Sequence, residues 1–133
     1  MVAGGVAYHG DAGTSDSARM WDPRTAQFDD ASHLLAARFG HAATLLPDGR
    51  VLVTGGSFFA RDPADAAAAA PIAPEARDPR SGVFVPAGTM VAERSGHTAT
   101  LLEDGRVLIV GGVKRSPDRS DSPAPFAELY VGP

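Results

Sequence analysis

The sequence contains one stretch of 35 residues twice, and this repeat limits the fold more than any other feature. Residues 22–56 return as residues 78–112, at a constant offset of 56 and without a gap. Of the 35 aligned positions, 20 are identical. An internal period near 50 residues is typical of architectures in which each copy builds one supersecondary unit and neighbouring units stack. The chain is therefore predicted to consist of similar units placed side by side.

Each copy contains a predicted β-hairpin. In the first copy, residues 41–46 and 50–54 are mostly apolar, and Asp48-Gly49 between them favours a tight turn. Apolar residues occupy both faces of these two strands, unlike a sheet that has one face in water. A small antiparallel sheet that is apolar on both faces needs a neighbour on each side, and sheets stacked around an axis supply it.

Two histidines, His41 and His97, occupy the same place in the two copies. They could be metal ligands or acid–base groups that converge near an axis, or structural groups that hydrogen-bond to backbone within or between units. Packing residues follow the symmetry of a repeat, whereas residues that act on a ligand usually break it. The equivalence of the two histidines therefore favours the structural role.

Arginines also occupy the same places in the two copies, and they too could have either a binding role or a structural role. A row of cations could hold an anionic ligand, or the guanidinium groups could bridge strands and neighbouring units. Because isolated surface ion pairs are a weak signal of binding, we favour the structural role. We expect the partners to be Asp48, Asp104 or backbone carbonyl groups. The arginines concerned are Arg38, Arg50, Arg94 and Arg106.

Each copy ends in a pair of glycines, Gly55-Gly56 and Gly111-Gly112. A strand that runs into a double glycine resembles the start of a dinucleotide-binding loop. That loop needs further glycines at fixed positions and then a helix, and neither pair is followed by such glycines. We therefore expect these glycines to permit a close backbone approach where a strand ends.

The composition excludes several classes of function. The 133 residues carry a formal charge of −4 and no basic stripe, so no nucleic-acid partner is expected. Without cysteine, the chain can form no disulfide, thiolate metal site or cysteine nucleophile. No apolar run approaches the ~20 residues that span a bilayer, and no signal peptide is visible, which leaves the compartment open. No nucleophile elbow, metal-binding helix motif or phosphate loop occurs, so we expect no cofactor and no enzymatic activity.

The repeated text as a whole resembles the kelch repeat. The resemblance is carried by Arg-x-x-His-x-Ala-Thr-Leu-Leu, then Asp-Gly-Arg-Val-Leu, then Gly-Gly, and by a short strand that ends near Asp-Pro. The pattern is most similar to kelch repeats of bacterial proteins and of galactose-oxidase-like propellers. It implies an all-β fold of four-stranded antiparallel blades, in an incomplete propeller of about two to three blades. The strands implied are 41–46, 51–54, 74–78 and 83–86 in one blade, and 97–102, 107–110 and 126–130 in the next.

On this resemblance the chain divides into three parts. Residues 1–37 are expected to be the remnant of a preceding blade, with strands around Met20 and Phe28, and its connection. Residues 38–93 would form a full repeat, and residues 94–133 a repeat that lacks its last strand. The pattern expects an aromatic residue before Asp-Pro. Trp21 and Tyr130 fill this place, whereas Arg77 departs from it.

The loops that follow the glycine pairs differ between the copies, and loops on a rigid repeat vary most freely. We therefore expect any ligand contact in 57–73 and 113–125, and we expect the second of these to be a solvated loop. Phe58 and Phe59 could form an exposed contact patch or pack beneath the loop that they begin, and the sequence leaves both possibilities open. The candidate contact residues are Ser57, Phe58, Phe59, Arg61, Lys114 and Arg115.

The sequence favours a kelch-type binding scaffold for a protein or carbohydrate ligand, as part of a larger propeller. Either self-association or the rest of that propeller would cover the end blades. The resemblance also implies an alternative, a piece of a copper-dependent carbohydrate or alcohol oxidase similar to galactose oxidase. Proteins of that family use tyrosine and histidine copper ligands and a tyrosine crosslinked to cysteine. This chain has no cysteine, and Tyr8 and Tyr130 lie in no recognisable ligand pattern.

Overall fold

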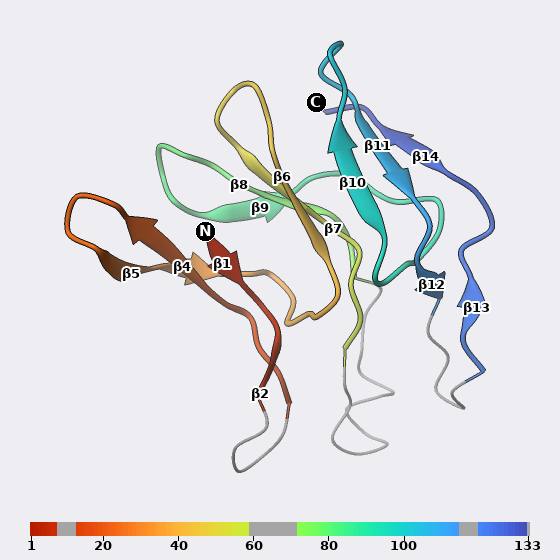
Figure 1. The fold of residues 1–133 in the computed structure, drawn as a ribbon, viewed down its shortest axis with the longest axis horizontal. Coiled ribbons are helices and arrows are strands. Elements are labelled where there is room, and N and C mark those ends of the chain that lie inside the picture. Colours follow the sequence, from red (N-terminus) through yellow and green to blue (C-terminus); the bar gives the residue numbers. More distant parts are fainter. Residues whose placement is uncertain (8–12, 59–71, 115–119, 133) are drawn as a thin grey trace.

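The protein is all-β. The computed structural model describes residues 1–7, 13–58, 72–114 and 120–132, which form strands and turns. Three antiparallel sheets lie side by side along the molecule (Figure 1). In the described part of the chain, no helix has the length and apolarity needed to cross a membrane. The all-β fold expected from the repeat is thus confirmed.

The middle sheet has four strands in the order β6 (Ala42–Leu45), β7 (Val51–Thr54), β8 (Glu75–Arg77) and β9 (Phe84–Pro86). Neighbouring strands are antiparallel and consecutive in sequence. All four lie within the predicted strand ranges. The Asp-Gly turn closes the β6–β7 hairpin, because the amide N–H of Gly49 donates to the carbonyl oxygen of Leu46 at 3.0 Å.

The third sheet repeats three of these strands, in the order β10 (Thr98–Leu101), β11 (Val107–Val110) and β14 (Glu128–Tyr130). The pairing of β10 with β11 copies that of β6 with β7, residue for residue, at the offset of the repeat. Between β11 and β14 the chain forms a small separate hairpin.

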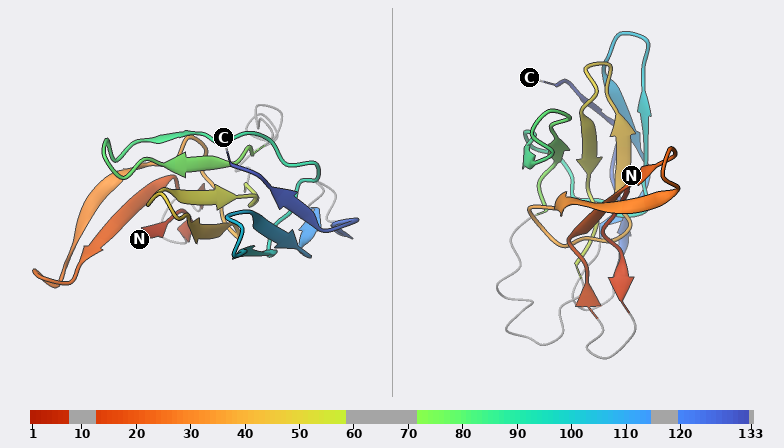
Figure 2. Two further views of the ribbon diagram at one scale, coloured as in Figure 1. Left: turned by 90° about the horizontal axis from the view of Figure 1, so that it is seen from above. Right: turned by 90° about the vertical axis from the view of Figure 1, so that its left-hand side faces the viewer.

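The first sheet consists of β1 (Val2–Ala3), β4 (Ser17–Asp22) and β5 (Gln27–His33), in that order. The strands expected around Met20 and Phe28 are therefore present, and β1 adds a third strand. Seen from above, the long β4–β5 hairpin extends away from the other two sheets (Figure 2).

Two short hairpins leave the sheets after a glycine pair. One consists of β2 (Val6–Ala7) and β3 (Gly13–Thr14), and the other of β12 (Val113–Lys114) and β13 (Ser122–Pro123). Both hairpins project to the same side of the molecule, opposite to the β6–β7 and β10–β11 turns (Figure 1). The expectation that 113–125 is a plain loop is thus wrong at both ends, because the backbones of β12 and β13 pair with each other.

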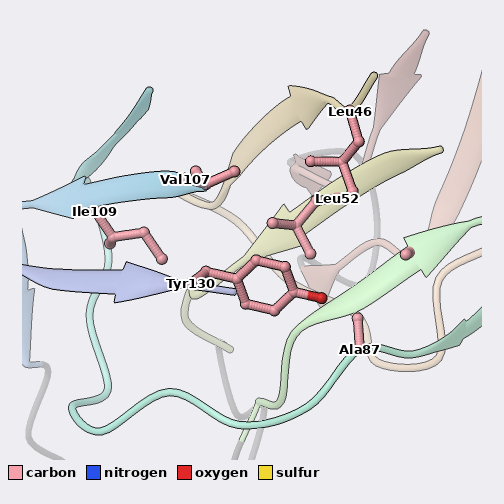
Figure 3. Packing of buried hydrophobic residues seen from close by; sticks show 7 residues of the cluster. Leu46, Leu52, Ala87, Val107, Ile109 and Tyr130 are labelled. Atoms are coloured by element: carbon pink, nitrogen blue, oxygen red, sulfur yellow. The ribbon is translucent and has the colours of Figure 1, made fainter. Parts of the chain in front are cut away.

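Two hydrophobic clusters fill the spaces between the sheets, and the middle sheet contributes to both. Leu52 and Val53, neighbours on β7, are both fully buried, but they point to opposite faces. Leu52 belongs to the cluster shared with the third sheet, and Val53 to the cluster shared with the first. In the first of these clusters, the Tyr130 ring lies close to Leu52 and Ala87 (Figure 3). The predicted covering of both faces is therefore observed for the middle sheet.

Candidate functional site

The first repeated arginine, Arg38, is buried and bound on several sides. Its guanidinium lies 2.5 Å from Oε1 of Glu75, and it donates hydrogen bonds to the carbonyl oxygens of Gly55 (3.1 Å) and Ala73 (3.0 Å). The backbone N–H of Leu35 donates to the other Glu75 oxygen at 2.6 Å. Burial raises the pKa of the Glu75 carboxyl, against the opposing effect of the Leu35 N–H and the Arg38 charge. The network ties the segment before β6 to β7 and β8.

The second copy repeats this network with other residues. Arg94 lies 2.9 Å from Oε1 of Glu128 and donates to the carbonyl oxygens of Gly111 (2.9 Å) and Phe126 (2.8 Å). The backbone N–H of Val91 donates to the other Glu128 oxygen at 2.7 Å. Because both arginines are buried at 1% exposure, neither guanidinium group is open to an anionic ligand from solvent.

The other two arginines singled out from the repeat, Arg50 and Arg106, bind within their own hairpins. Arg50 pairs with Asp48 and Arg106 with Asp104, in each case at 2.6 Å. The expected aspartate partners are thus found, but only for these two arginines.

Sequence reasoning missed the glutamates that pair with the buried arginines. Glu75 and Glu128 are 53 residues apart, so the ungapped repeat, which has a period of 56 and ends at residue 112, does not align them. Aligning the strands of the two copies with a gap in the loop would have placed Glu75-Ala76-Arg77 over Glu128-Leu129-Tyr130.

The repeated histidines lie in the seams between sheets. Nε2 of His97 is 3.0 Å from Oγ1 of Thr54, the last residue of β7. His41 occupies the equivalent seam beside Gly4, where Ala3 offers no hydroxyl in the place of Thr54. Burial lowers the pKa of both imidazoles, and the nearby Arg38 and Arg94 charges lower it further. Both sites therefore favour neutral histidine.

The glycine pairs lie where the backbones of adjacent sheets approach each other. The N–H of Gly56 donates to the carbonyl oxygen of Arg94 at 2.8 Å, and the N–H of Gly5 donates to that of Arg38 at 2.9 Å. A Cβ atom on Gly112 would lie 2.9 Å from Cβ of His97 in its own repeat. Thus the glycine pair of one unit packs against the Arg-x-x-His segment of the next unit and donates a hydrogen bond to its backbone.

Three of the candidate contact residues are described. Ser57 forms a two-hydrogen-bond bridge with Phe39, the side chain of Phe58 is at the margin of exposure at 36%, and Lys114 lies exposed 4.0 Å from Glu93. Phe59, Arg61 and Arg115 lie outside the described residues, as does most of 57–73. The two possibilities for the phenylalanine pair therefore stay predictions.

A groove of about 660 Å³ lies between residues 90–93 and the β12–β13 hairpin. Its wall exposes two large apolar side chains, Val91 at 77% and Phe126 at 50%, beside the charged groups of Glu93 and Lys114. A groove of this kind can take an apolar group flanked by polar ones. The lining residues are Met90, Val91, Ala92, Glu93, Lys114, Ser122, Pro123, Pro125 and Phe126.

The described residues do not fit a copper centre. His97 is engaged by Thr54, and the charge of Arg38 acts on His41 and that of Arg94 on His97, in each case against a second positive charge such as a bound cation. Within residues 1–7, 13–58, 72–114 and 120–132, no three His, Cys, Asp or Glu side chains come together as a possible metal site. Tyr130 is buried in an apolar cluster, and Tyr8 lies outside the described residues.

Comparison with known proteins shows a likeness of fold alone. No protein-family model and no curated protein matches the sequence. Among solved structures, the fold is similar to that of a fungal alcohol oxidase of the AA5 family in complex with copper, with a TM-score of 0.58 and 19% sequence identity. The match covers 90% of this chain and 22% of the oxidase chain. The chain thus shares the fold of about a fifth of that larger protein.

Proposed function

We propose that the chain is a non-catalytic binding scaffold of the kelch type, built as one unit of a larger propeller. Propellers contain about 4–8 blades, so the three sheets of this chain can form only part of a ring. The proposed domain division, 1–37, 38–93 and 94–133, assigns one sheet to each part. The fungal alcohol oxidase supports this proposal, because a fold like that of this chain makes up 22% of its longer chain.

The observation that carries this proposal is the groove between residues 90–93 and the β12–β13 hairpin. The repeated ionisable residues, such as Arg38 and His97, are engaged in contacts within or between sheets. By contrast, Val91, Phe126 and Lys114 line the groove, and the side chains of Val91 and Phe126 are at least half exposed. We propose that the groove binds an apolar side chain of a protein ligand, with carbohydrate as the alternative ligand class.

The second candidate function is a copper-dependent oxidase of the galactose oxidase kind, which the fold of the AA5 neighbour favours. The chemistry of the described residues argues against it, because the repeated histidines lie beside arginines. Isothermal titration with Cu²⁺ separates the two functions. Tight binding of one copper ion per chain would overturn the scaffold proposal.

The groove is tested by selecting peptides from a displayed library and by probing a glycan array. We expect peptides with an apolar anchor to bind the protein. Replacing Val91 and Phe126 with aspartate should weaken that binding at least about tenfold, because large apolar anchors dominate such contacts. Val83→Glu is the matched control, since Val83 is 52% exposed in the β8–β9 turn, away from the groove.

Two results would count against the groove. One is a library and an array that yield no binder. The other is a binder whose affinity is unchanged by the aspartate substitutions. Glycans that bind the groove, in place of peptides, would assign the carbohydrate alternative.

A further inference from the structure

The outer side of the third sheet carries an exposed apolar row. Thr100 pairs with Leu108, and Leu108 pairs with Leu129, so the three side chains share one face of the sheet. Val110, two residues beyond Leu108, points the same way. Val110 is 43% exposed and Leu129 is 44% exposed. We call these four residues the trailing face.

The same row in the middle sheet is buried. There Thr44 pairs with Leu52, and Leu52 pairs with Ala76. The exposed fractions of these three residues are 8%, 0% and 1%, because the third sheet packs against them. The trailing face is therefore a second copy of a surface that already forms a sheet–sheet interface within this chain.

The outer side of the first sheet carries a different apolar surface. Trp21 pairs with Phe28, and their ring centroids are 5.0 Å apart. Val2 pairs with Arg19, which lies two residues before Trp21 and so shares its face. Val2, Trp21 and Phe28 are 60%, 46% and 47% exposed. We call these three residues the leading face.

The equivalents of the leading face are also buried within the chain. Phe84, the copy of Phe28 in the middle sheet, is 1% exposed in the cluster that faces the first sheet. Tyr130, which holds the place of Trp21 in the third sheet, is 8% exposed and packs against Leu52. In both internal interfaces, then, the side of one sheet that corresponds to the trailing face packs against the side of the next sheet that corresponds to the leading face.

We propose that the trailing face of one copy of this chain binds the leading face of a second copy, head to tail. The occupant follows from continuity with the two internal interfaces, because a single chain presents both halves of the same contact at its two ends. This rests on the propeller-like stacking in the proposed function and is independent of the groove. Since the two faces differ, the contact is heterologous and leads to a closed ring or an extending array.

The test begins with the mass of the protein in solution. Sedimentation equilibrium over about a hundredfold range of concentration should show an average mass that rises above the 13.7 kDa of the monomer. Leu129→Glu on the trailing face and Trp21→Glu on the leading face should each weaken association at least about tenfold. Both positions are exposed in the single chain, so at protein concentrations at which the wild type is monomeric each variant should keep the wild-type melting temperature. Val83→Glu serves as the control that should associate like the wild type.

Mixing the two variants then tests the head-to-tail geometry. Each variant retains one intact face, the leading face in Leu129→Glu and the trailing face in Trp21→Glu. An equimolar mixture should therefore form a dimer of twice the 13.7 kDa monomer mass and nothing larger. If instead two like faces bound each other symmetrically, mixing the two variants would not form a dimer between them.

Three outcomes would overturn the proposal. The first is a wild-type protein that stays monomeric, which would assign the two faces to other occupants such as further blades. The second is association that neither variant weakens, and the third is a mixture that remains monomeric. Peptide or glycan binding to the groove can be measured on the same samples, so loss of association and loss of ligand binding are distinguished.

Discussion

Gly55 and Gly111 end the same strand in two copies of the repeat, but the structure surrounds them differently. Both have positive φ, +56° and +74°. A Cβ atom on Gly55 would press against the backbone carbonyl oxygen of Arg94 and lie 2.6 Å from Cε1 of His97. A Cβ atom on Gly111 would have no atom of the described residues within 4 Å. The pair Gly55→Ala and Gly111→Ala therefore separates backbone strain from crowding between sheets.

The two contributions can be worked out separately. Placing alanine in the left-handed region costs about 1–2 kcal/mol, of which about 0.4–1 kcal/mol is offset by the stiffer unfolded chain. Gly111→Ala should thus destabilise by about 1 kcal/mol. Gly55→Ala adds overpacking of about 1–3 kcal/mol. It also strains two contacts, from Gly56 N–H to Arg94 and from His97 to Thr54, each of about 1 kcal/mol. A total of about 4 kcal/mol is expected.

Urea and thermal unfolding at low protein concentration measure this difference. For a chain of this length, 1 kcal/mol shifts the melting temperature by about 4 °C, so we expect losses of about 4 °C for Gly111→Ala and about 15 °C for Gly55→Ala. His33→Ala is the background control, because the His33 side chain is 74% exposed. Equal losses for the two glycine variants would refute the view that close approach of Arg94 and His97 fixes glycine at position 55.

Three further outcomes are expected in unfolding experiments. Glu75→Gln should cost about 3–5 kcal/mol because it leaves Arg38 buried without its counter-charge, whereas Asp48→Asn in an exposed pair should cost under about 1 kcal/mol; equal costs would contradict this. Tyr130→Phe should keep or raise the melting temperature, since the buried hydroxyl has no partner among the described residues, and a clear fall would reveal one. The lowered pKa of His97 means that its stabilising neutral form is fully present above about pH 6.5 and stability falls as the pH drops below it; a stability that His97→Asn leaves equally pH-dependent would oppose this.

The positions of the strands could be predicted from the sequence because the repeat shows the same pattern twice. The Asp-Gly turn fixes each hairpin, and apolar residues on both faces, such as Leu52 and Val53, predict neighbours on both sides. The fold class and the strand positions of the middle and third sheets follow from these local signals.

The contacts across the seams could not be predicted in the same way. Sequence identity makes Gly55 and Gly111 equivalent, yet only Gly55 has a following sheet packed against it. Likewise, Leu52 and Leu108 match in the repeat, but only Leu52 is fully buried. What a residue touches depends on the unit that comes next in space, and a comparison of copies along one chain does not contain that information. The groove was predicted on one side only: 113–125, which includes Lys114, was an expected contact segment, whereas residues 90–93 lie inside the repeat and showed no sign of a second wall.

Leu52 and Val53, which are neighbours on β7, couple the unfolding of the two hydrophobic clusters. Because β7 supplies side chains to both hydrophobic clusters, this strand cannot separate from one sheet without loosening the other. Among the described residues, each end sheet contributes to one of the two clusters, so it can open alone, as terminal units of a repeat do. In native-state hydrogen exchange, amides of β7 should therefore exchange only through global unfolding, while those of β1 and β14 exchange through smaller openings. The central strand is thus the point at which three stacked units become a single cooperative one.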